Sequence, residues 1–272
     1  KSECKNDLPG LVHDVSASGS TFFIEPMQAV NANNELRELL IAERKEIERI
    51  LAELSADCAN YRTHIEENYR VLVTLDCIFA RAKLSFAMNA ISPEIRTDGT
   101  LELRRARHPL IDKQVVVPVT VRLGSDFDTL IITGPNTGGK TVTLKTIGLL
   151  TLMAECGLHI PADDGSAISV FPLVLADIGD EQSIEQSLST FSAHMKSIVE
   201  IVNVCDSDSL VLLDELGAGT DPAEGAALAV ALIEFCRQCG ARVAATTHYA
   251  ELKIYAMRTE GVMNASCEFD VE

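Results

Sequence analysis

The sequence predicts an α/β fold, in which a sheet with flanking helices follows a mostly helical segment. Three observations lead to this prediction. Short apolar runs alternate with helical patterns from residue 130 onward. A glycine-rich loop follows the first of these runs directly, and residues 31–90 carry apolar positions at helical spacing among charged residues. We therefore divide the chain into a helical region, residues 1–95, and an α/β domain, residues 96–272.

Composition limits the classes of protein to consider. The chain has 272 residues, 47% of them hydrophobic, which suffices for one large domain and a smaller part. No apolar stretch reaches the roughly 18 residues that a membrane span needs, so no membrane partner is expected. The net charge of −17 argues against a broad nucleic-acid-binding surface on this segment itself. Because the sequence starts with Lys1 and lacks a leader pattern, we expect a piece of a longer protein.

Eight cysteines are scattered along the sequence. In a long chain without a secretion signal, this distribution is typical of reduced thiols in a cytoplasmic protein. Cys236 and Cys239 form a C-x-x-C at the end of a helical pattern, with Gly240 placed to terminate that helix. We interpret them as two thiols one helical turn apart, and the alternative is a redox or zinc site.

The N-terminal part is expected to contain a small β element and two long helices. Residues 8–26 combine strand-forming residues with turn formers. Residues 31–90 then show two successive helical patterns, which we expect to form an antiparallel pair. The pair is either a hairpin packed on a core or a lever that joins the α/β domain to a distal part.

The α/β domain begins with short β-rich segments between residues 101 and 129. Beyond them, strands are expected at 130–133, 170–176, 209–213 and 242–246, and helices from Lys140, Thr190 and Pro222. This alternation predicts a parallel sheet whose ligand lies at the carboxyl ends of the strands.

The loop after the first strand reads G-x-x-x-x-G-K-T and predicts a nucleoside triphosphate site. Its backbone amides can surround phosphates, the Lys140 ammonium can neutralise the β- and γ-phosphates, and the Thr141 hydroxyl can bind Mg²⁺. The predicted ligands are ATP and Mg²⁺. The nucleotide-binding residues are Gly134, Pro135, Asn136, Thr137, Gly138, Gly139, Lys140, Thr141 and Val142.

Two further strands end in residues suited to hydrolysis. Asp214 follows an apolar strand and can hold Mg²⁺ directly or through water, and the adjacent Glu215 is the expected general base. His248 follows another strand and can contact the γ-phosphate or the attacking water. Taken alone, the acidic pair could be a polar turn, and the histidine an ordinary surface or core residue.

Residues 186–195 precede an apolar helical face, so Ser189 or Thr190 is expected to cap that helix. Capping explains the hydroxyls fully. The alternative is that this helix end approaches a phosphate on another subunit, so that two subunits meet head to tail and complete each other's site. Asp221 ends a glycine-rich turn directly before Pro222, which suits the first position of a helix.

These motifs together resemble the ATPase domain of the MutS family of DNA mismatch-repair ATPases, which belongs to the ABC class of P-loop proteins. The resemblance rests on TGPNTGGKT at 133–141, LSTF at 188–191, LDELGAGTD at 213–221, TTH at 246–248, RHPL at 107–110 and GLHIPA at 157–162. The stretch VHDVSASGSTFFIEP at 12–26 is similar to the second bacterial branch of the family, which suppresses homologous recombination.

The resemblance implies a homodimer with two composite ATP sites. Ser189 and Thr190 would be donated across the interface, Asp221 would lie in an interface loop, and the helices of 31–90 would serve as core and lever. Intact relatives bind branched or mismatched DNA, carry a C-terminal nuclease module, and in some cases act on stalled ribosomes. The resemblance therefore places endonuclease activity in the intact protein and not in this chain.

The sequence departs from the family pattern in two respects. It contains nothing similar to the mismatch-reading domain, and an aromatic partner for adenine is not evident before the phosphate loop, where residues 115–119 stand. Two alternatives stay open. One is a nucleotide-binding subunit of an ABC transporter, which would carry a glycine-rich signature in place of LSTF. The other is a nucleotide-sensing dimerisation scaffold with little turnover.

Overall fold

The computed structural model describes residues 3, 7, 9–135, 138–179, 187–218 and 220–267, with the backbone alone for 187–193. The chain divides into two compact units, Lys1–Asp76 and Cys77–Glu272. Their division falls within a helix, earlier than the boundary predicted between residues 95 and 96. The functional division at that boundary stays a prediction.

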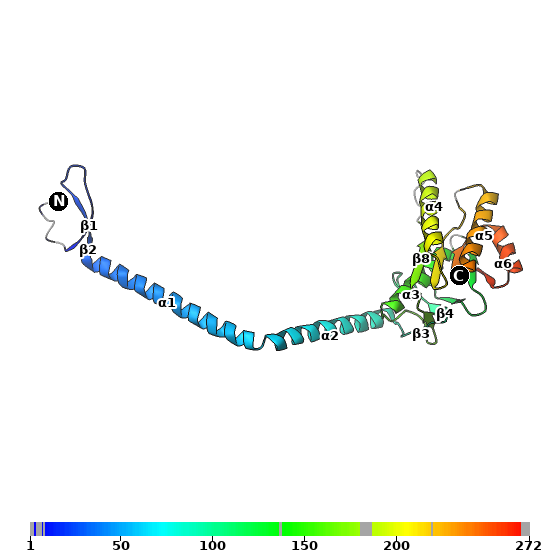
Figure 1. The fold of residues 1–272 in the computed structure, drawn as a ribbon, viewed down its shortest axis with the longest axis horizontal. Helices are drawn as coiled ribbons and strands as arrows, with labels where there is room; N and C mark the ends of the chain where they lie inside the picture. Colours follow the sequence, from blue (N-terminus) through cyan, green and yellow to red (C-terminus); the bar gives the residue numbers. More distant parts are fainter. Residues whose placement is uncertain are drawn as a thin grey trace. The chain divides into compact units, whose positions relative to one another are not determined.

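The first unit starts with a β hairpin. Strand β1 (Gly10–Val15) pairs antiparallel with β2 (Phe22–Pro26), and the register shifts between Val12 and Asp14. Helix α1 (Met27–Asn60) follows β2 directly (Figure 1). The turn formers of residues 8–26 thus mark a two-stranded element, as the sequence predicted.

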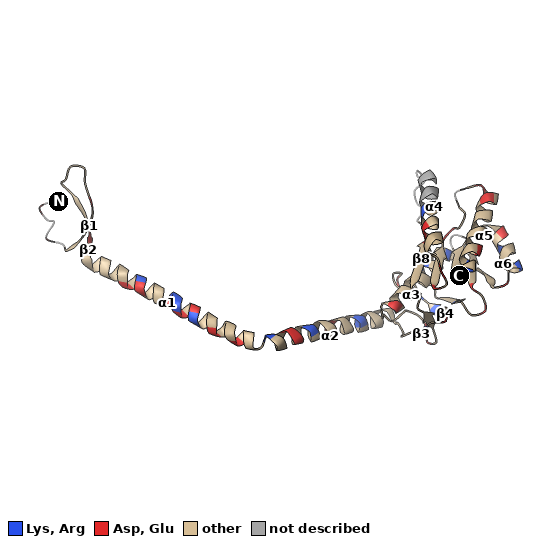
Figure 2. Ribbon diagram, in the orientation of Figure 1, with Lys and Arg blue, Asp and Glu red and all other residues tan. Residues whose placement is uncertain are grey.

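Two long helices account for the helical periodicity. Only Tyr61 separates α1 from α2 (Arg62–Met88), and neither helix contains glycine or proline. Basic and acidic residues are interspersed along α1 (Figure 2), where Arg49 pairs with Glu46 and Glu53, each at 2.6 Å. No side chain of α1 or α2 is buried. Both helices are confirmed, whereas their antiparallel packing stays a prediction.

The second unit is built on a five-stranded, all-parallel sheet of order β11-β6-β10-β9-β8. Its strands are β6 (Thr129–Thr133), β8 (Leu173–Asp177), β9 (Ser209–Leu213), β10 (Arg242–Thr246) and β11 (Val262–Ser266). Its helices are α3 (Lys140–Glu155), α4 (Ser187–Val204), α5 (Pro222–Gln238) and α6 (Ala250–Arg258). This arrangement confirms the α/β fold class with a parallel sheet.

Helices cover both faces of this sheet. Along β9, Leu210 and Leu212 belong to the core cluster that contains α3, whereas Val211 and Leu213 belong to the cluster formed with α4, α5 and α6. Alternate residues of a strand point to opposite faces, so a strand covered on both sides must be apolar throughout. All five residues of β6 and of β9 are buried, and the polar residues among them lie at the ends of these strands.

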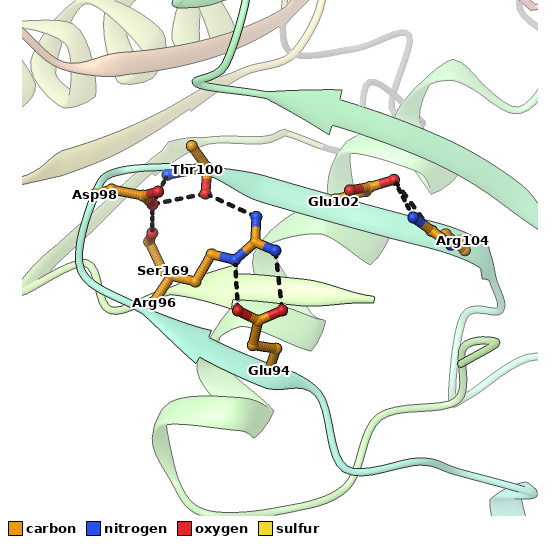
Figure 3. A network of polar contacts seen from close by, with 7 residues as sticks. All are labelled: Glu94, Arg96, Asp98, Thr100, Glu102, Arg104 and Ser169. Atoms are coloured by element: carbon orange, nitrogen blue, oxygen red, sulfur yellow. Dashed lines mark hydrogen bonds and ion pairs between the residues drawn. The ribbon is translucent and has the colours of Figure 1, made fainter. Parts of the chain in front are cut away.

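A smaller mixed sheet lies in the same unit, with strand order β3-β7-β4-β5. Its strands are β3 (Glu94–Arg96), β4 (Leu101–Ala106), β5 (Val119–Leu123) and β7 (Ala167–Ser169). Figure 3 shows how Asp98 accepts hydrogen bonds from Thr100, through its backbone and its hydroxyl, and from Ser169 of β7. The hydrogen bonds from Thr100, followed by that from Ser169, lower the pKa of Asp98 to about 2. The Asp98 carboxylate thereby ties β7 to the turn between β3 and β4.

The segment directly after α2 is attached both to Arg107, which follows β4, and to the segment that follows α3. Arg107 donates a 2.7 Å hydrogen bond from Nη2 to the Asn89 carbonyl, directly after α2. Ile91 and Ile160 exchange two backbone hydrogen bonds of 2.9 Å. Because α3 begins with Lys140, the phosphate loop and the end of α2 lie at opposite ends of one rigid helix. Within the described residues, no helix is long and apolar enough to cross a membrane.

Candidate nucleotide site

The strand order brings three predicted motifs to one edge of the five-stranded sheet. Strand β10 lies between β6 and β9, and all three run parallel. The residues that follow their carboxyl ends are Gly134, Asp214 and Thr247. Ligands of open parallel sheets bind at such an edge.

The glycine-rich loop joins β6 to α3 as predicted. Gly134 and Gly139 have φ values of 134° and 80°, which disfavour residues with a side chain. A Cβ on Gly134 would also lie 2.4 Å from the Cys267 carbonyl oxygen. Of the predicted nucleotide-binding residues, Asn136 and Thr137 lie outside the described part, and the other seven occupy this loop and the first turn of α3.

Lys140 holds its ammonium inside the loop. The residue is 2% exposed, and its Nζ donates a 2.8 Å hydrogen bond to the Gly134 carbonyl. The same Nζ lies 3.0 Å from Nε2 and 3.3 Å from Nδ1 of His248. The pKa of Lys140 is lowered, because burial of the ammonium outweighs the opposing effect of the Glu215 and Asp214 carboxylates. An ammonium in this position can exchange its contacts with protein groups for contacts with a phosphate, with little movement of the side chain.

Thr141 and Asp214, the two residues predicted to bind magnesium, lie beside each other. Asp214 is 5% exposed at the end of β9, and Thr141 Oγ1 donates to Asp214 Oδ1 at 3.2 Å. Mg²⁺ binds oxygen ligands and usually takes one or two from protein and the rest from phosphate and water. One hydroxyl and one carboxylate therefore fit this ion when a nucleotide supplies further oxygens. In the described part of the chain, no three His, Cys, Asp or Glu side chains are grouped to hold a metal alone.

Glu215 and His248 face each other at the same edge. Glu215 Oε1 lies 3.6 Å from His248 Nε2. Glu215 has a φ of 46°, in the left-handed region that residues other than glycine rarely adopt. The His248 side chain is 46% exposed, so the pair lies at the surface of the site and not in the core. The Glu215 carboxylate and the His248 imidazole are therefore accessible to a water molecule or to a phosphate oxygen of a bound nucleotide.

The structure adds three residues that the sequence did not single out. Thr246, at the end of β10, hydrogen-bonds to Asp214 through its hydroxyl and accepts the Glu215 amide. Asp177, at the end of β8, pairs with His194 of α4, and their Oδ2 and Nδ1 atoms are 2.9 Å apart. These contacts depend on which strands are neighbours, and the sequence order does not carry that information.

One prediction about the trans-acting hydroxyls is wrong. Helix α4 begins at Ser187, so Ser189 and Thr190 lie inside its first turn and are not its N-cap. The apolar face beginning at residue 191 marked the helix but not its first turn. The side chains of both residues lie outside the described part, and their role across an interface stays a prediction.

Asp221 caps α5 and has a defined local function. Its Oδ1 accepts hydrogen bonds from the backbone amides of Ala223, at 2.9 Å, and Glu224, at 3.3 Å. Pro222 takes the first helical position, as predicted. The predicted place of Asp221 in an interface loop is not tested by this contact.

An apolar cavity of about 670 Å³ adjoins the phosphate loop. Gly138, Gly139 and Val142 form its border with the loop, and this volume lies in the range typical of small-molecule sites. The remaining apolar lining comes from Ile111, Val115, Val116, Val117, Val119, Val121, Phe127, Leu130, Ile132, Met263, Ala265 and Cys267. Phe127, two residues before β6, is the aromatic residue of this lining.

Comparison with known proteins gives consistent results. The family model described as MutS domain V matches residues 130–272. Over all 272 residues, the chain is 58% identical to Endonuclease MutS2 of Agathobacter rectalis, 57% identical to that of Ruminiclostridium cellulolyticum and 56% identical to that of Acetivibrio thermocellus. The chain covers 34% of the length of each of these relatives.

Proposed function

Because the chain belongs to the MutS family, in its MutS2 branch, we propose that it binds and hydrolyses ATP within a larger DNA-processing protein. The observation that carries this proposal is the meeting of Lys140, the Thr141–Asp214 pair and the Glu215–His248 pair at one sheet edge. A cation, a magnesium-type ligand pair and a base beside a histidine are the parts that phosphoryl transfer to water requires.

ATP binding uses the phosphate loop and the adjoining cavity. The backbone amides of the loop and the Lys140 ammonium hold the phosphates, since both direct hydrogen-bond donors and positive charge toward the loop. The adenine ring enters the apolar cavity, where Phe127 and the valines of 115–117 contact its faces. Lys140 then exchanges its contact with His248 for contacts with phosphate oxygens.

Hydrolysis relies on the residues opposite the loop. Glu215 accepts a proton from the attacking water, and His248 contacts the terminal phosphate or that water. Thr141 and Asp214 would hold Mg²⁺, which supplies charge neutralisation for the phosphates. Asp214 is nearly buried and Glu215 is partly exposed, so the two adjacent carboxylates have separate tasks.

We further propose that two copies form a homodimer with composite sites. Ser189 and Thr190 of one subunit complete the site of the other, and Asp221 lies beside the interface. Turnover then changes the position of α3, and the segment beyond its far end is attached to the segment after α2 through the backbone hydrogen bonds of Ile91 and Ile160. This link supports a lever role for α1 and α2.

The remaining assignments concern the intact protein. The relatives are named endonucleases and are about three times as long as this chain. We propose that regions outside these 272 residues bind branched or mismatched DNA, that any endonuclease activity resides there, and that some forms act on stalled ribosomes. A cytoplasmic location follows from these partners.

The decisive experiment compares ATP turnover by the full-length protein with that of Glu215→Gln. We expect turnover to fall at least ~10²-fold while ATP binding is retained, because the amide cannot accept the proton. Glu251→Gln, at an exposed position on α6, is the matched control and should keep parental turnover. Lys140→Met should lose ATP binding.

Two results would redirect the assignment. Equal turnover in the parent and in Glu215→Gln would remove Glu215 from the reaction. Tight ATP binding with negligible turnover in the parent itself would indicate a nucleotide-sensing scaffold.

A further inference from the structure

Thr246 makes an unusual set of contacts for a strand residue. It is the last residue of β10 and is fully buried. Its Oγ1 donates to Asp214 Oδ1 at 2.5 Å and accepts the Glu215 amide at 2.8 Å. Its carbonyl accepts the Leu216 amide at 3.1 Å. The hydroxyl and the backbone carbonyl of Thr246 thus bind three consecutive residues, 214–216, directly after β9.

The hydroxyl acts both as a donor and as an acceptor in this arrangement. A threonine hydroxyl has one proton to donate and lone pairs to accept. The proton goes to the Asp214 carboxylate, and a lone pair receives the Glu215 N–H. A valine of the same shape would fill the space and could make neither bond. The contacts therefore identify the hydroxyl, and not the shape of the side chain, as the important feature.

The backbone of Glu215 depends on such support. Its φ of 46° is unfavourable for a residue with a side chain, and conformations of this kind persist only where surrounding contacts determine them. The Glu215 amide has the Thr246 hydroxyl as its hydrogen-bond acceptor. Without that acceptor, an extended conformation at residue 215 would move the carboxylate away from His248.

We propose that the Thr246 hydroxyl is a positioning group that holds Asp214 and Glu215 in one fixed arrangement. This inference rests on the proposed ATPase function. Asp214 is aimed at the metal side of the site and Glu215 at the water side, while His248 follows Thr246 by two residues on the same strand end. A single hydroxyl thus sets the distance between the groups that bind the metal and the group that takes the proton.

The test compares Thr246→Val and Thr246→Ser in the full-length protein. For Thr246→Val we expect kcat for ATP to fall ~10²-fold, as displaced catalytic groups do, with KM changed less than about threefold. Thr246→Ser keeps both hydrogen bonds and should retain kcat within about threefold. Thr151→Val is the matched control, because Thr151 is also fully buried and hydrogen-bonded, but lies along α3 away from the site.

A second measurement separates positioning from general damage. Amide exchange should accelerate at residues 214–216 in Thr246→Val, with exchange elsewhere in the sheet unchanged. Should Thr246→Val not fold, Thr246→Ala with its smaller side chain takes its place and should show the same loss of kcat.

Three outcomes would overturn the inference. They are parental kcat in Thr246→Val, equal losses in the valine and serine variants, and a rise in KM without a change in kcat. If the parent hydrolyses ATP and one of these outcomes is seen, only the role of Thr246 is refuted. A parent without turnover would refute the proposed function and this inference together.

Discussion

Thr141 Oγ1 donates a 3.2 Å hydrogen bond to Asp214 Oδ1, which joins the first turn of α3 to the end of β9 across 73 positions of the sequence. The contact places a neutral donor against a nearly buried carboxylate. An ion that replaces this hydrogen bond would find two oxygen ligands already adjacent.

Asp214→Asn tests that arrangement. The amide keeps the shape but loses the charge, so we expect the Mg²⁺ concentration that half-saturates ATP-dependent thermal stabilisation to rise about tenfold or more. ATP binding in the presence of EDTA should change little. Asp208→Asn, at an exposed turn, should leave the magnesium dependence unaltered. An unchanged magnesium midpoint in Asp214→Asn would remove this residue from the metal site.

Val117→Asp examines the predicted base pocket. Val117 lines the cavity and is 78% exposed at its mouth, so an aspartate there should not disturb folding. We expect ATP affinity to fall about tenfold, since the new charge repels the nucleotide and weakens apolar contact with the base. Affinity for inorganic triphosphate should fall less. Val170→Asp, at an exposed valine that does not line the cavity, serves as control in both titrations.

Subunit mixing tests whether Ser189 and Thr190 act across an interface. Lys140→Ala and the double variant Ser189→Ala with Thr190→Ala should each be inactive alone. Their mixture should recover part of the turnover, because one of the two sites in a mixed dimer combines an intact loop with intact hydroxyls. Specific activity of the parent should also rise with protein concentration. Flat concentration dependence and an inactive mixture would indicate a self-contained site.

Thiol labelling reports on the environment of Cys236. Burial raises the pKa of this thiol to about 12, so at pH 8 it should stay unlabelled in the folded protein while Cys58, Cys77 and Cys156 react. The folded pKa lies above the ordinary value of 9.0. The stability that the neutral thiol contributes is therefore present below pH 9 and is lost as the pH rises toward 12.

Urea unfolding between pH 8 and pH 11 measures that loss. Cys236→Ala should show a shallower decline in stability than the parent, and Cys58→Ala, at an exposed position, should follow the parent. Rapid labelling of Cys236 in the folded state would contradict its burial and reopen the redox or zinc interpretation of the C-x-x-C pair.

Local patterns predicted most of the α/β domain correctly. Residues 130–132 and 210–213 are uninterrupted apolar runs, a pattern typical of strands covered on both faces, and Pro222 and Gly240 mark the limits of α5. Each of these signals lies within a few residues of the feature that it predicts. The phosphate loop belongs to the same category.

Features that depend on strand order were not accessible in this way. Thr246 contacts Asp214 because β10 is inserted between β6 and β9, and the cavity joins Phe127 to residues near 115 and 265. Strand β7 was missed because three residues carry too little periodicity. The start of α4 was predicted three residues too late, at Thr190 and not at Ser187, since a serine inside the first turn resembles a serine that caps it.

The left-handed backbone of Glu215 makes thermal stability and the proposed hydrolysis favour different residues at this position. A glycine would adopt this conformation without strain, so variants selected for thermal tolerance alone should accumulate glycine here and, under the role proposed for Glu215, lose turnover. Selection for turnover would keep a carboxylate at this position in its unfavourable backbone conformation. The rest of the molecule must then be stable enough to offset the cost of that conformation.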